Sequence, residues 1–371
     1  MIKLKFKVAK AALVAAVSKA ERAVPARSTI PALEFMLLGA NGAEAYVSAT
    51  SLDLSVHAPV EGALVTTPGQ GAVSAKMFRD IVAKLPDGEV TVAVDEKFQA
   101  TVTCGRVKVV VPGIDPEQYP ELPAVDGETF DMTVEELRAA VQGTAFAASR
   151  SGDPRTSAVH IETGPKFAPG MRVTALDGHR IAIRLAEVPD FQPIPELDML
   201  VPVNVLTDAV RALPKDGNVT VSVDKSHLRF TAEDGTEATA VRVDGKYFDV
   251  DRMVAMDVKT SVTISRDAVL AALDRASLFV RENDKVPIVM ETGDGCITIS
   301  ILSVLGRGEE PVDADVAGEP LKIGFNPRLL MEALRASDDT EIKIDFSTAR
   351  QPCAIKGARY HHIILPVAIR G

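Results

Sequence analysis

The chain has 371 residues, of which 46% are apolar and 25% are charged. This is the composition of a folded globular protein, and it excludes a disordered or fibrous one. The length predicts two or three domains, because a single hydrophobic core stops growing near roughly 250–300 residues. The net charge of −10, taken alone, argues against a nucleic-acid partner.

The N-terminal segment 1–21 has a basic start and a short apolar run. Lys10 interrupts that run, and charged residues follow it with helical spacing, so we expect an amphipathic helix rather than a secretion signal. The sequence has no uninterrupted apolar stretch of about 18 residues, so we expect no membrane-spanning helix. Cys104, Cys296 and Cys353 show no metal-binding spacing and are expected to be reduced core residues of a cytoplasmic protein.

An internal threefold repeat organises the chain. The segments FKVAKAALVAAV from Phe6, FDMTVEELRAAV from Phe130 and VTISRDAVLAAL from Val262 each predict a short strand followed by a helix. A second set of three similar segments begins at Val73, Val201 and Ile323. Each of these predicts an entry strand, a helix, a polar turn and an alternating strand.

The repeat predicts an α+β fold of three similar domains, each with two helices and antiparallel sheets, at 1–124, 128–247 and 257–371. Two sheet edges would remain unpaired at the ends of such an array, and exposed edges promote aggregation unless they are covered. Pairing head to tail with a second copy would close a ring and remove both edges.

Charge is divided unequally between the expected helices and the rest of the chain. The six helical windows together carry +7, so the remaining residues carry −17; the windows are 7–22, 76–84, 131–150, 204–215, 265–281 and 326–336. A ring lined by these helices would attract a polyanion to its inside only. This distribution reverses the conclusion drawn from net charge alone.

Several motifs, spread over essentially the whole chain, resemble those of a single protein family. They are RSTIPAL from Arg27, the linker DPEQYPELP, LDGHRIAI at 176–183, VDGKYFDVDRM, and the C-terminal HHIILPVAIRG. Their order and spacing are similar to those of the bacterial sliding clamp, the beta subunit of DNA polymerase III. The resemblance implies a homodimeric ring around duplex DNA that tethers the polymerase and other replication and repair proteins without catalysing a reaction.

The resemblance also implies the partners. They are double-stranded DNA bound without sequence specificity, the DNA polymerase III alpha subunit, other proteins with clamp-binding motifs, and a clamp loader. No cofactor, metal or membrane is implied, and the location would be cytoplasmic and associated with the nucleoid.

By the same resemblance, an apolar pocket would receive short linear motifs of partner proteins. Its expected residues are Leu176, Gly178, His179, Arg180, Ile181, Phe248, Arg252, Met253, Ile363, Leu365, Pro366 and Val367. The chain departs from the family pattern at Phe248 and Val250, where Pro and Tyr are usual. The segment 153–159 is also shorter and more polar than usual, so Thr156 and Ser157 are not counted as pocket residues. These departures imply an altered partner preference.

Two further sets of residues carry the other expected contacts. The cations expected to contact DNA phosphates are Lys7, Lys10, Lys19, Arg22, Arg27, Arg79, Arg150 and Arg211. The residues expected at the dimer interface are Lys76, Arg106, Val109, Val111, Leu278, Phe279, Glu309 and Glu310. The alternative for Leu278 and Phe279 is that both are core residues.

Two other functions compete with the clamp interpretation. A hydrolase could use His179 with Asp177, but the sequence has no phosphate loop, metal cluster or nucleophile elbow to support it. A repeat-built scaffold could bind proteins without encircling DNA. Retention on circular but not on linear DNA would distinguish the clamp from the scaffold.

Overall fold

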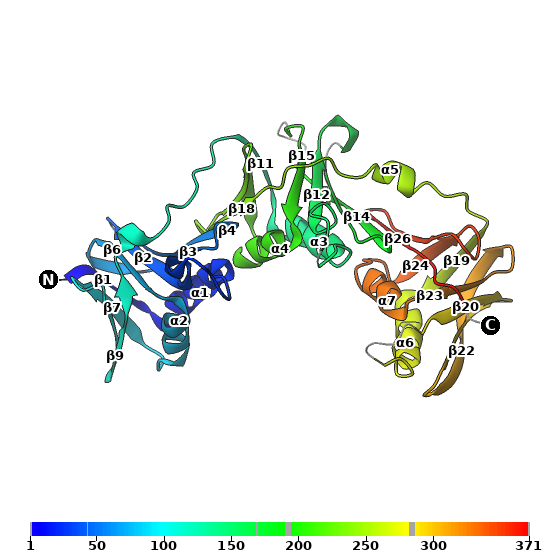
Figure 1. Cartoon of the computed structure of the whole chain (residues 1–371), viewed down its shortest axis with the longest axis horizontal. Helices are drawn as coiled ribbons and strands as arrows, with labels where there is room; N and C mark the ends of the chain where they lie inside the picture. Colours follow the sequence, from blue (N-terminus) through cyan, green and yellow to red (C-terminus); the bar gives the residue numbers. More distant parts are fainter. Residues whose placement is uncertain are drawn as a thin grey trace. The chain divides into compact units, whose positions relative to one another are not determined.

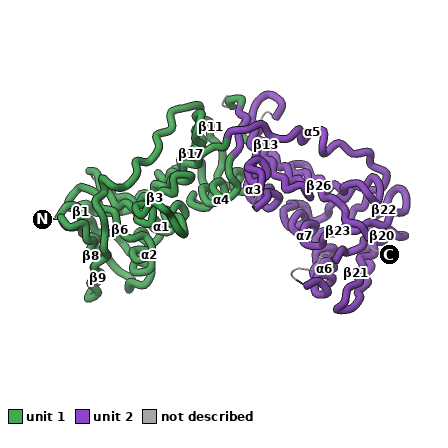
Figure 2. Tube along the Cα trace, in the orientation of Figure 1, with its two compact units in different colours: residues 1–138, 187–196, 201–243 green, residues 139–186, 197–200, 244–371 purple. Residues whose placement is uncertain are grey.

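A computed structural model describes residues 2–42, 44–150, 152–167, 170–189, 194–281 and 286–369. These residues fold into two compact units, shown in green and purple in Figure 2. Unit 1 comprises 1–138, 187–196 and 201–243, and unit 2 comprises 139–186, 197–200 and 244–371. The expected central domain therefore contributes to both units. The domain boundaries read from the sequence remain predictions.

Unit 1 contains two antiparallel sheets. The first has the order β5–β1–β7–β8–β9, with β1 Ile2–Ala9, β5 Leu64–Thr67, β7 Glu89–Asp95, β8 Ala100–Cys104 and β9 Val107–Val111. The second has the order β10–β6–β2–β3–β4–β18–β17–β16–β11, with β2 Phe35–Asn41, β3 Glu44–Thr50, β4 Leu54–Pro59, β6 Gly69–Ser74, β10 Gly113–Ile114, β11 Glu128–Thr133, β16 Asn218–Val223, β17 His227–Ala232 and β18 Glu237–Val241.

The helices of unit 1 form one layer against these sheets. They are α1 Lys10–Ala20, α2 Ala75–Lys84 and α4 Val203–Ala212, with short 3-10 turns at Glu21–Ala23, Pro31–Glu34 and Pro116–Gln118. Helix α1 packs against both α2 and α4 and covers β3 and β4, as the blue and green ribbons of Figure 1 show. Helix α3, Val134–Ala145, begins in unit 1 and ends in unit 2.

Unit 2 is built on a sheet of the order β15–β12–β13–β14–β26–β25–β24–β19–β22–β21–β20–β23. The strands are β12 Ala158–Thr163, β13 Gly170–Leu176, β14 Arg180–Glu187, β15 Asp198–Pro202, β19 Thr260–Ser265, β20 Ile288–Gly293, β21 Cys296–Ser303, β22 Gly306–Gly318, β23 Lys322–Phe325, β24 Glu341–Phe346, β25 Cys353–Lys356 and β26 Tyr360–Ile364. Helices α6 Arg266–Ser277 and α7 Pro327–Arg335 lie side by side (Figure 1). Helix α5 Val250–Met253 and a 3-10 turn at Pro165–Phe167 complete the unit.

Local sequence explains where the helices begin and end. Ser265 caps α6 by accepting a hydrogen bond from the Ala268 amide, and Asn326 caps α7 by accepting one from the Arg328 amide. Pro327 occupies the first turn of α7, where its missing N–H costs nothing. Helix α2 ends before Pro86, which cannot continue it.

Strand pairing joins consecutive repeats within each unit. In unit 1, β4 of the first repeat pairs antiparallel with β18 of the second, and Leu54 lies opposite Ala240. In unit 2, β14 of the second repeat pairs antiparallel with β26 of the third, and Ile181 lies opposite Ile363. Each unit therefore contains a sheet that continues across a repeat boundary.

The structure confirms the α+β architecture, the antiparallel sheets and the two helices of each repeat. Two local differences stand out. Strand β1 extends to Ala9, so Lys7 lies on a strand rather than on the helix. Helix α5 was not expected, and Asp249 caps it from the linker between the second and third repeats.

Candidate functional site

A tight turn between β13 and β14 presents His179 to solvent. The Asp177 carboxylate accepts hydrogen bonds from the backbone amides of His179 (3.0 Å) and Arg180 (3.2 Å). Gly178 occupies the turn with φ of +84°, a conformation that glycine adopts at little cost. The turn is thus held by its own side chain and backbone, and it leaves the imidazole exposed.

Arg180 is buried and anchors the turn to α7. Its guanidinium donates to Asp177 Oδ2 at 3.0 Å, forms an ion pair with Glu332, and lies 5.2 Å from the centroid of the Phe146 ring. Burial alone would raise the pKa of Glu332. Hydrogen bonds from Arg180 and Arg328 outweigh it and hold this pKa below its ordinary value.

The C-terminal segment lies directly beside this turn. Strand β26 pairs with β14, and the Leu365 amide then donates a hydrogen bond to the His179 carbonyl at 2.9 Å. Leu176, Ile181 and Ile363 are buried beneath the surface, whereas the side chain of Leu365 is 39% exposed. The β14–β26 pair therefore places an exposed leucine next to an exposed histidine.

A cavity of about 290 Å³ opens at this place. Four of the expected pocket residues line it: His179, Leu365, Pro366 and Val367. Sequence reasoning missed the rest of its wall, which comes from the third repeat: Val280, Val286, Pro287, Asn326, Pro327 and Leu329. The Asn-Pro that begins α7 was visible in the sequence, but nothing there indicated that it faces the C-terminal segment.

The other expected pocket residues are distributed around this cavity. Met253 and Ile363 line a second, smaller cavity of about 80 Å³. Phe248 packs edge to face on Tyr247, and the Arg155 guanidinium lies 4.7 Å from the Phe248 ring centroid. Arg252 is exposed and lies 3.5 Å from Asp249. The structure thus gathers six of the expected residues into two cavities and leaves the others beneath or beside them.

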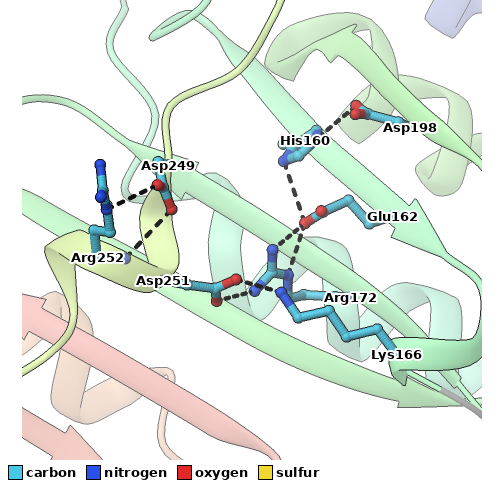
Figure 3. A network of polar contacts seen from close by, with 8 residues as sticks. All are labelled: His160, Glu162, Lys166, Arg172, Asp198, Asp249, Asp251 and Arg252. Atoms are coloured by element: carbon cyan, nitrogen blue, oxygen red, sulfur yellow. Dashed lines mark hydrogen bonds and ion pairs between the residues drawn. The ribbon is translucent and has the colours of Figure 1, made fainter.

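A polar network holds α5 against β13, as Figure 3 shows. The Arg172 guanidinium donates to Glu162 Oε2 at 2.7 Å and to Asp251 Oδ1 at 2.6 Å. Lys166 forms a second ion pair with Asp251, and the two cations hold the pKa of Asp251 below its usual range. Because Asp251 lies between Val250 and Arg252 on α5, this network fixes the segment that carries Met253.

The geometry does not support the alternative of a His179–Asp177 pair in a hydrolase. The Asp177 carboxylate contacts the His179 backbone amide and the Arg180 guanidinium, and both contacts position the turn. Among the described residues, no cluster of three or more His, Cys, Asp or Glu side chains could hold a metal ion. This turn is built to present side chains and contains no recognisable catalytic arrangement.

Most of the cations expected to contact DNA form ion pairs within the chain. Lys7 pairs with Glu89, Lys10 with Asp87, Lys19 with Asp234, Arg79 with Glu21 and Asp80, and Arg211 with Asp208. Within the described ranges, Arg22, Arg27 and Arg150 are exposed and have no ion pair. Among the eight expected cations, these three carry the charge most available to a polyanion.

The residues expected at the dimer interface lie mostly on the surface. On the edge strand β9, Val107 and Val110 are exposed and Val109 is half-buried, with Arg106 exposed just before the strand. Val111 is buried, so its side chain cannot reach a partner. Lys76 at the start of α2 is also exposed.

The third-repeat residues expected at the interface are also accessible, at least in part. Leu278 is 78% exposed, which excludes the alternative that it is a core residue. Phe279 is half-buried. On β22, Glu309 is exposed, and Glu310 accepts a hydrogen bond from Arg275 Nε at 2.9 Å.

Buried His362, on the strand that carries the candidate site, predicts a sensitivity to acid. Burial lowers the pKa of His362 to about 3, well below its ordinary value of 6.5. The unfolded chain therefore binds a proton between these two values that the folded chain does not, so stability falls as pH drops from about 6.5. We expect a loss of roughly 1 kcal/mol per pH unit from this group.

Thermal unfolding midpoints at pH 7.5 and pH 5.0 measure this effect. His362→Phe should lose less stability between the two pH values than the unmodified chain, because it removes the group that must take up a proton. His179→Ala, which removes an exposed histidine, serves as the control and should keep the original sensitivity. Equal acid sensitivity in His362→Phe and the unmodified chain would contradict this account.

Comparisons with known proteins agree with this arrangement. Family models of the DNA polymerase III beta subunit match the N-terminal domain at residues 4–123, the central domain at 131–249 and the C-terminal domain at 251–368. The beta sliding clamp of Synechococcus elongatus is 28% identical over 365 residues, which cover 95% of this chain and 96% of that protein.

Solved structures give the same result. A chain described as a DNA polymerase III beta subunit from Eubacterium rectale is 30% identical and has a TM-score of 0.91, covering 98% of this chain and 99% of that one. The sliding clamp of Bacillus subtilis is 26% identical with a TM-score of 0.93, covering 99% of this chain and all of that one. Separately, no helix in the described residues is long and apolar enough to cross a membrane.

Three matched domains in order, a shared fold and full-length identity lead to one assignment. The chain belongs to the family of bacterial DNA polymerase III beta subunits, the beta sliding clamps, which confer processivity on the polymerase and have no catalytic activity of their own.

Proposed function

We propose that two copies of this chain pair head to tail into a ring that encircles duplex DNA. The ring would hold the DNA polymerase III alpha subunit and other motif-bearing proteins at the His179–Leu365 face, and a clamp loader would open it. Its place would be the cytoplasm, at the nucleoid. The family implies DNA and polymerase partners in general, and the proposal assigns them to surfaces of this chain.

The strand order supplies the single observation that carries this proposal. Strands β4, β14 and β22 are each the third strand after the first main helix of their repeat, and β9, β18 and β26 are each the third strand after the second. A junction between repeats pairs one strand of the first set with one of the second. Two of the three possible junctions, β4–β18 and β14–β26, exist within the chain. The remaining members are β22 and β9, and β9 has one strand neighbour in its sheet order. Pairing β9 of one copy with β22 of another would repeat the same junction and close the ring.

The charges on these two strands complement each other. Arg106 and Lys108 lie at β9, while Glu309, Glu310 and Asp313 outnumber Arg307 on the half of β22 at 306–313. Residues 306–313 of β22 pair with β21 along one edge, whereas residues 314–318 pair with β19. The opposite edge of 306–313 is the one proposed to pair with β9. Opposite charges on facing strands favour one partner and one orientation.

Topological retention on DNA tests the proposal. Protein loaded by its clamp loader onto a nicked circular plasmid should stay bound through gel filtration, because the ring cannot leave a closed path. Linearising the plasmid should release it, since the phosphate contacts are weak and allow sliding. Equal loss from circular and linear DNA would refute encirclement and leave the protein-binding scaffold as the alternative.

Substituting Arg22 and Arg27, two exposed arginines of unit 1, separates DNA contact from ring closure. Arg22→Glu with Arg27→Glu should weaken duplex binding roughly tenfold at about 50 mM salt and reduce its salt dependence, because two phosphate contacts are lost. Fluorescence anisotropy over a salt series measures both effects. Lys7→Gln is the matched control: its charge is already paired with Glu89, so it should change binding less. An equal effect of both changes would contradict the assignment of these arginines.

A further inference from the structure

A second apolar cavity of about 290 Å³ lies in unit 2, under the linker that carries α5. Its apolar lining includes Ile183 and Leu185 of β14, Phe167, and Val254 after α5. Leu185 is 40% exposed, although it lies on a strand whose neighbouring residues are buried. None of the twelve residues expected in the partner pocket lines this cavity.

Cations surround this cavity. Lys166 and Arg172 line it, together with Lys356 at the end of β25 and Arg359 on the turn that follows. Asp251 is the single acidic residue of the lining, and it is already bound to Lys166 and Arg172. Lys356 is exposed and, within the described part of the chain, forms no ion pair. We call this site the basic-rimmed cavity.

The basic-rimmed cavity continues the face that would bind partner motifs. Side chains two residues apart on a strand point to the same side, so Ile181, Ile183 and Leu185 form one row on β14. On β26, Ile363 lies opposite Ile181 and His361 lies opposite Ile183. Val254 lines both the basic-rimmed cavity and the small cavity that contains Met253 and Ile363. A peptide leaving the small cavity therefore needs only a few residues to reach the cationic rim.

We propose that the basic-rimmed cavity binds the flank of a partner's clamp-binding segment, an extended stretch in which apolar side chains alternate with carboxylates. The apolar side chain would pack on Ile183 and Leu185, and a carboxylate would pair with Lys356 at the rim. This proposal rests on the proposed partner-binding role, and it names a further contact and the chemistry that selects it. Exposed Lys356 would repel a basic flank at the same place.

Peptides of matched length test the proposal. The core probe is a peptide with the C-terminal clamp-binding motif of a DNA polymerase III alpha subunit. Two longer probes add six alternating Leu and Glu residues at one end or the other, and two further probes replace each Glu with Lys. Fluorescence anisotropy against the full-length protein should show about tenfold tighter binding for one Leu/Glu extension and no gain for either Leu/Lys extension.

Charge reversal at the rim then locates the gain. Lys356→Glu and Leu185→Asp should each abolish the tenfold gain while leaving the affinity of the core peptide unchanged. Lys225→Glu, which reverses an exposed lysine of unit 1, should preserve the gain. If the core peptide binds but no extension tightens it, or if Lys356→Glu behaves like Lys225→Glu, the cavity proposal is wrong and the partner pocket stands. If the core peptide itself fails to bind, the partner pocket falls and this proposal falls with it.

Discussion

Replacing His179 and Leu365 together by Ala is expected to weaken binding of a polymerase-tail peptide by roughly 30-fold or more, because truncating a central interface side chain costs about 1–2 kcal/mol. Both side chains line the cavity of about 290 Å³ between the His179 turn and the start of α7, and both are exposed in the free protein. The hydrogen bond from the Leu365 amide to the His179 carbonyl uses backbone atoms only, so it survives the change. Fold and dimer should therefore remain intact while the peptide loses its anchors.

Isothermal titration calorimetry with the peptide measures this loss, and light scattering checks the dimer. Val258→Ala removes an apolar side chain that is 46% exposed in the same unit but lines none of the three cavities described above, so it is the matched control. Unchanged peptide affinity in the double variant would mean that the cavity is not the motif site. A loss of dimer together with a loss of affinity would mean that these residues support the fold.

Local pattern explains why the repeat units could be predicted from the sequence. Helix α2 ends at Lys84 because Pro86 follows, and β7 alternates because Val90 and Val92 face the core. Such signals lie within about twenty residues of one another in the sequence. They determine local structure through backbone preference and through the alternation of buried and exposed residues. The helical windows and alternating strands therefore came directly from composition and spacing.

The cavities and the ion pairs depend on distant residues, so spacing could not predict them. Lys19 pairs with Asp234, which lies 215 residues away in the chain. A charge count treats both as independent, but their pairing neutralises much of the field that Lys19 presents. The same holds for the wall of the cavity beside His179, which Leu329 of α7 and Pro366 of the C-terminal segment both line. The sequence identified the His179 turn and the C-terminal strand. The third-repeat residues that complete the cavity wall became visible only in the structure.

The orientation of Phe279 is a further feature that the sequence could not predict. Its ring lies over the backbone of β22, and a Cβ added at Gly306 or at Gly308 would stand 3.2 Å from a ring atom. Glycine at these positions lets the ring approach the strand closely. The sequence showed an apolar pair at 278–279, but it could not show that one member packs on its own sheet while the other points to solvent.

Leu278→Ala with Phe279→Ala is expected to convert the proposed head-to-tail dimer largely to monomer. A head-to-tail ring contains the same interface twice, so every loss at one interface is counted twice in the dimer. If the double change costs about 2 kcal/mol at each interface, the ring loses about 4 kcal/mol, which raises its dissociation constant roughly 1,000-fold. Sedimentation velocity at micromolar protein concentration should then show mainly monomer.

The contribution of Leu278 can be separated from that of Phe279, because the Leu278 side chain is mostly exposed whereas the Phe279 ring packs on β22. Leu278→Asp should dissociate the ring without lowering the unfolding midpoint, since its side chain is 78% exposed. Leu64→Asp is the matched control, because Leu64 is 66% exposed on β5, the edge of the five-stranded sheet opposite β9. If Leu278→Asp stays dimeric, the β9–β22 junction is not the ring interface. If Leu64→Asp dissociates as well, the five-stranded sheet pairs between copies through its β5 edge. The proposal that β9 and β22 pair between copies as β4 and β18 pair within one chain would then be wrong.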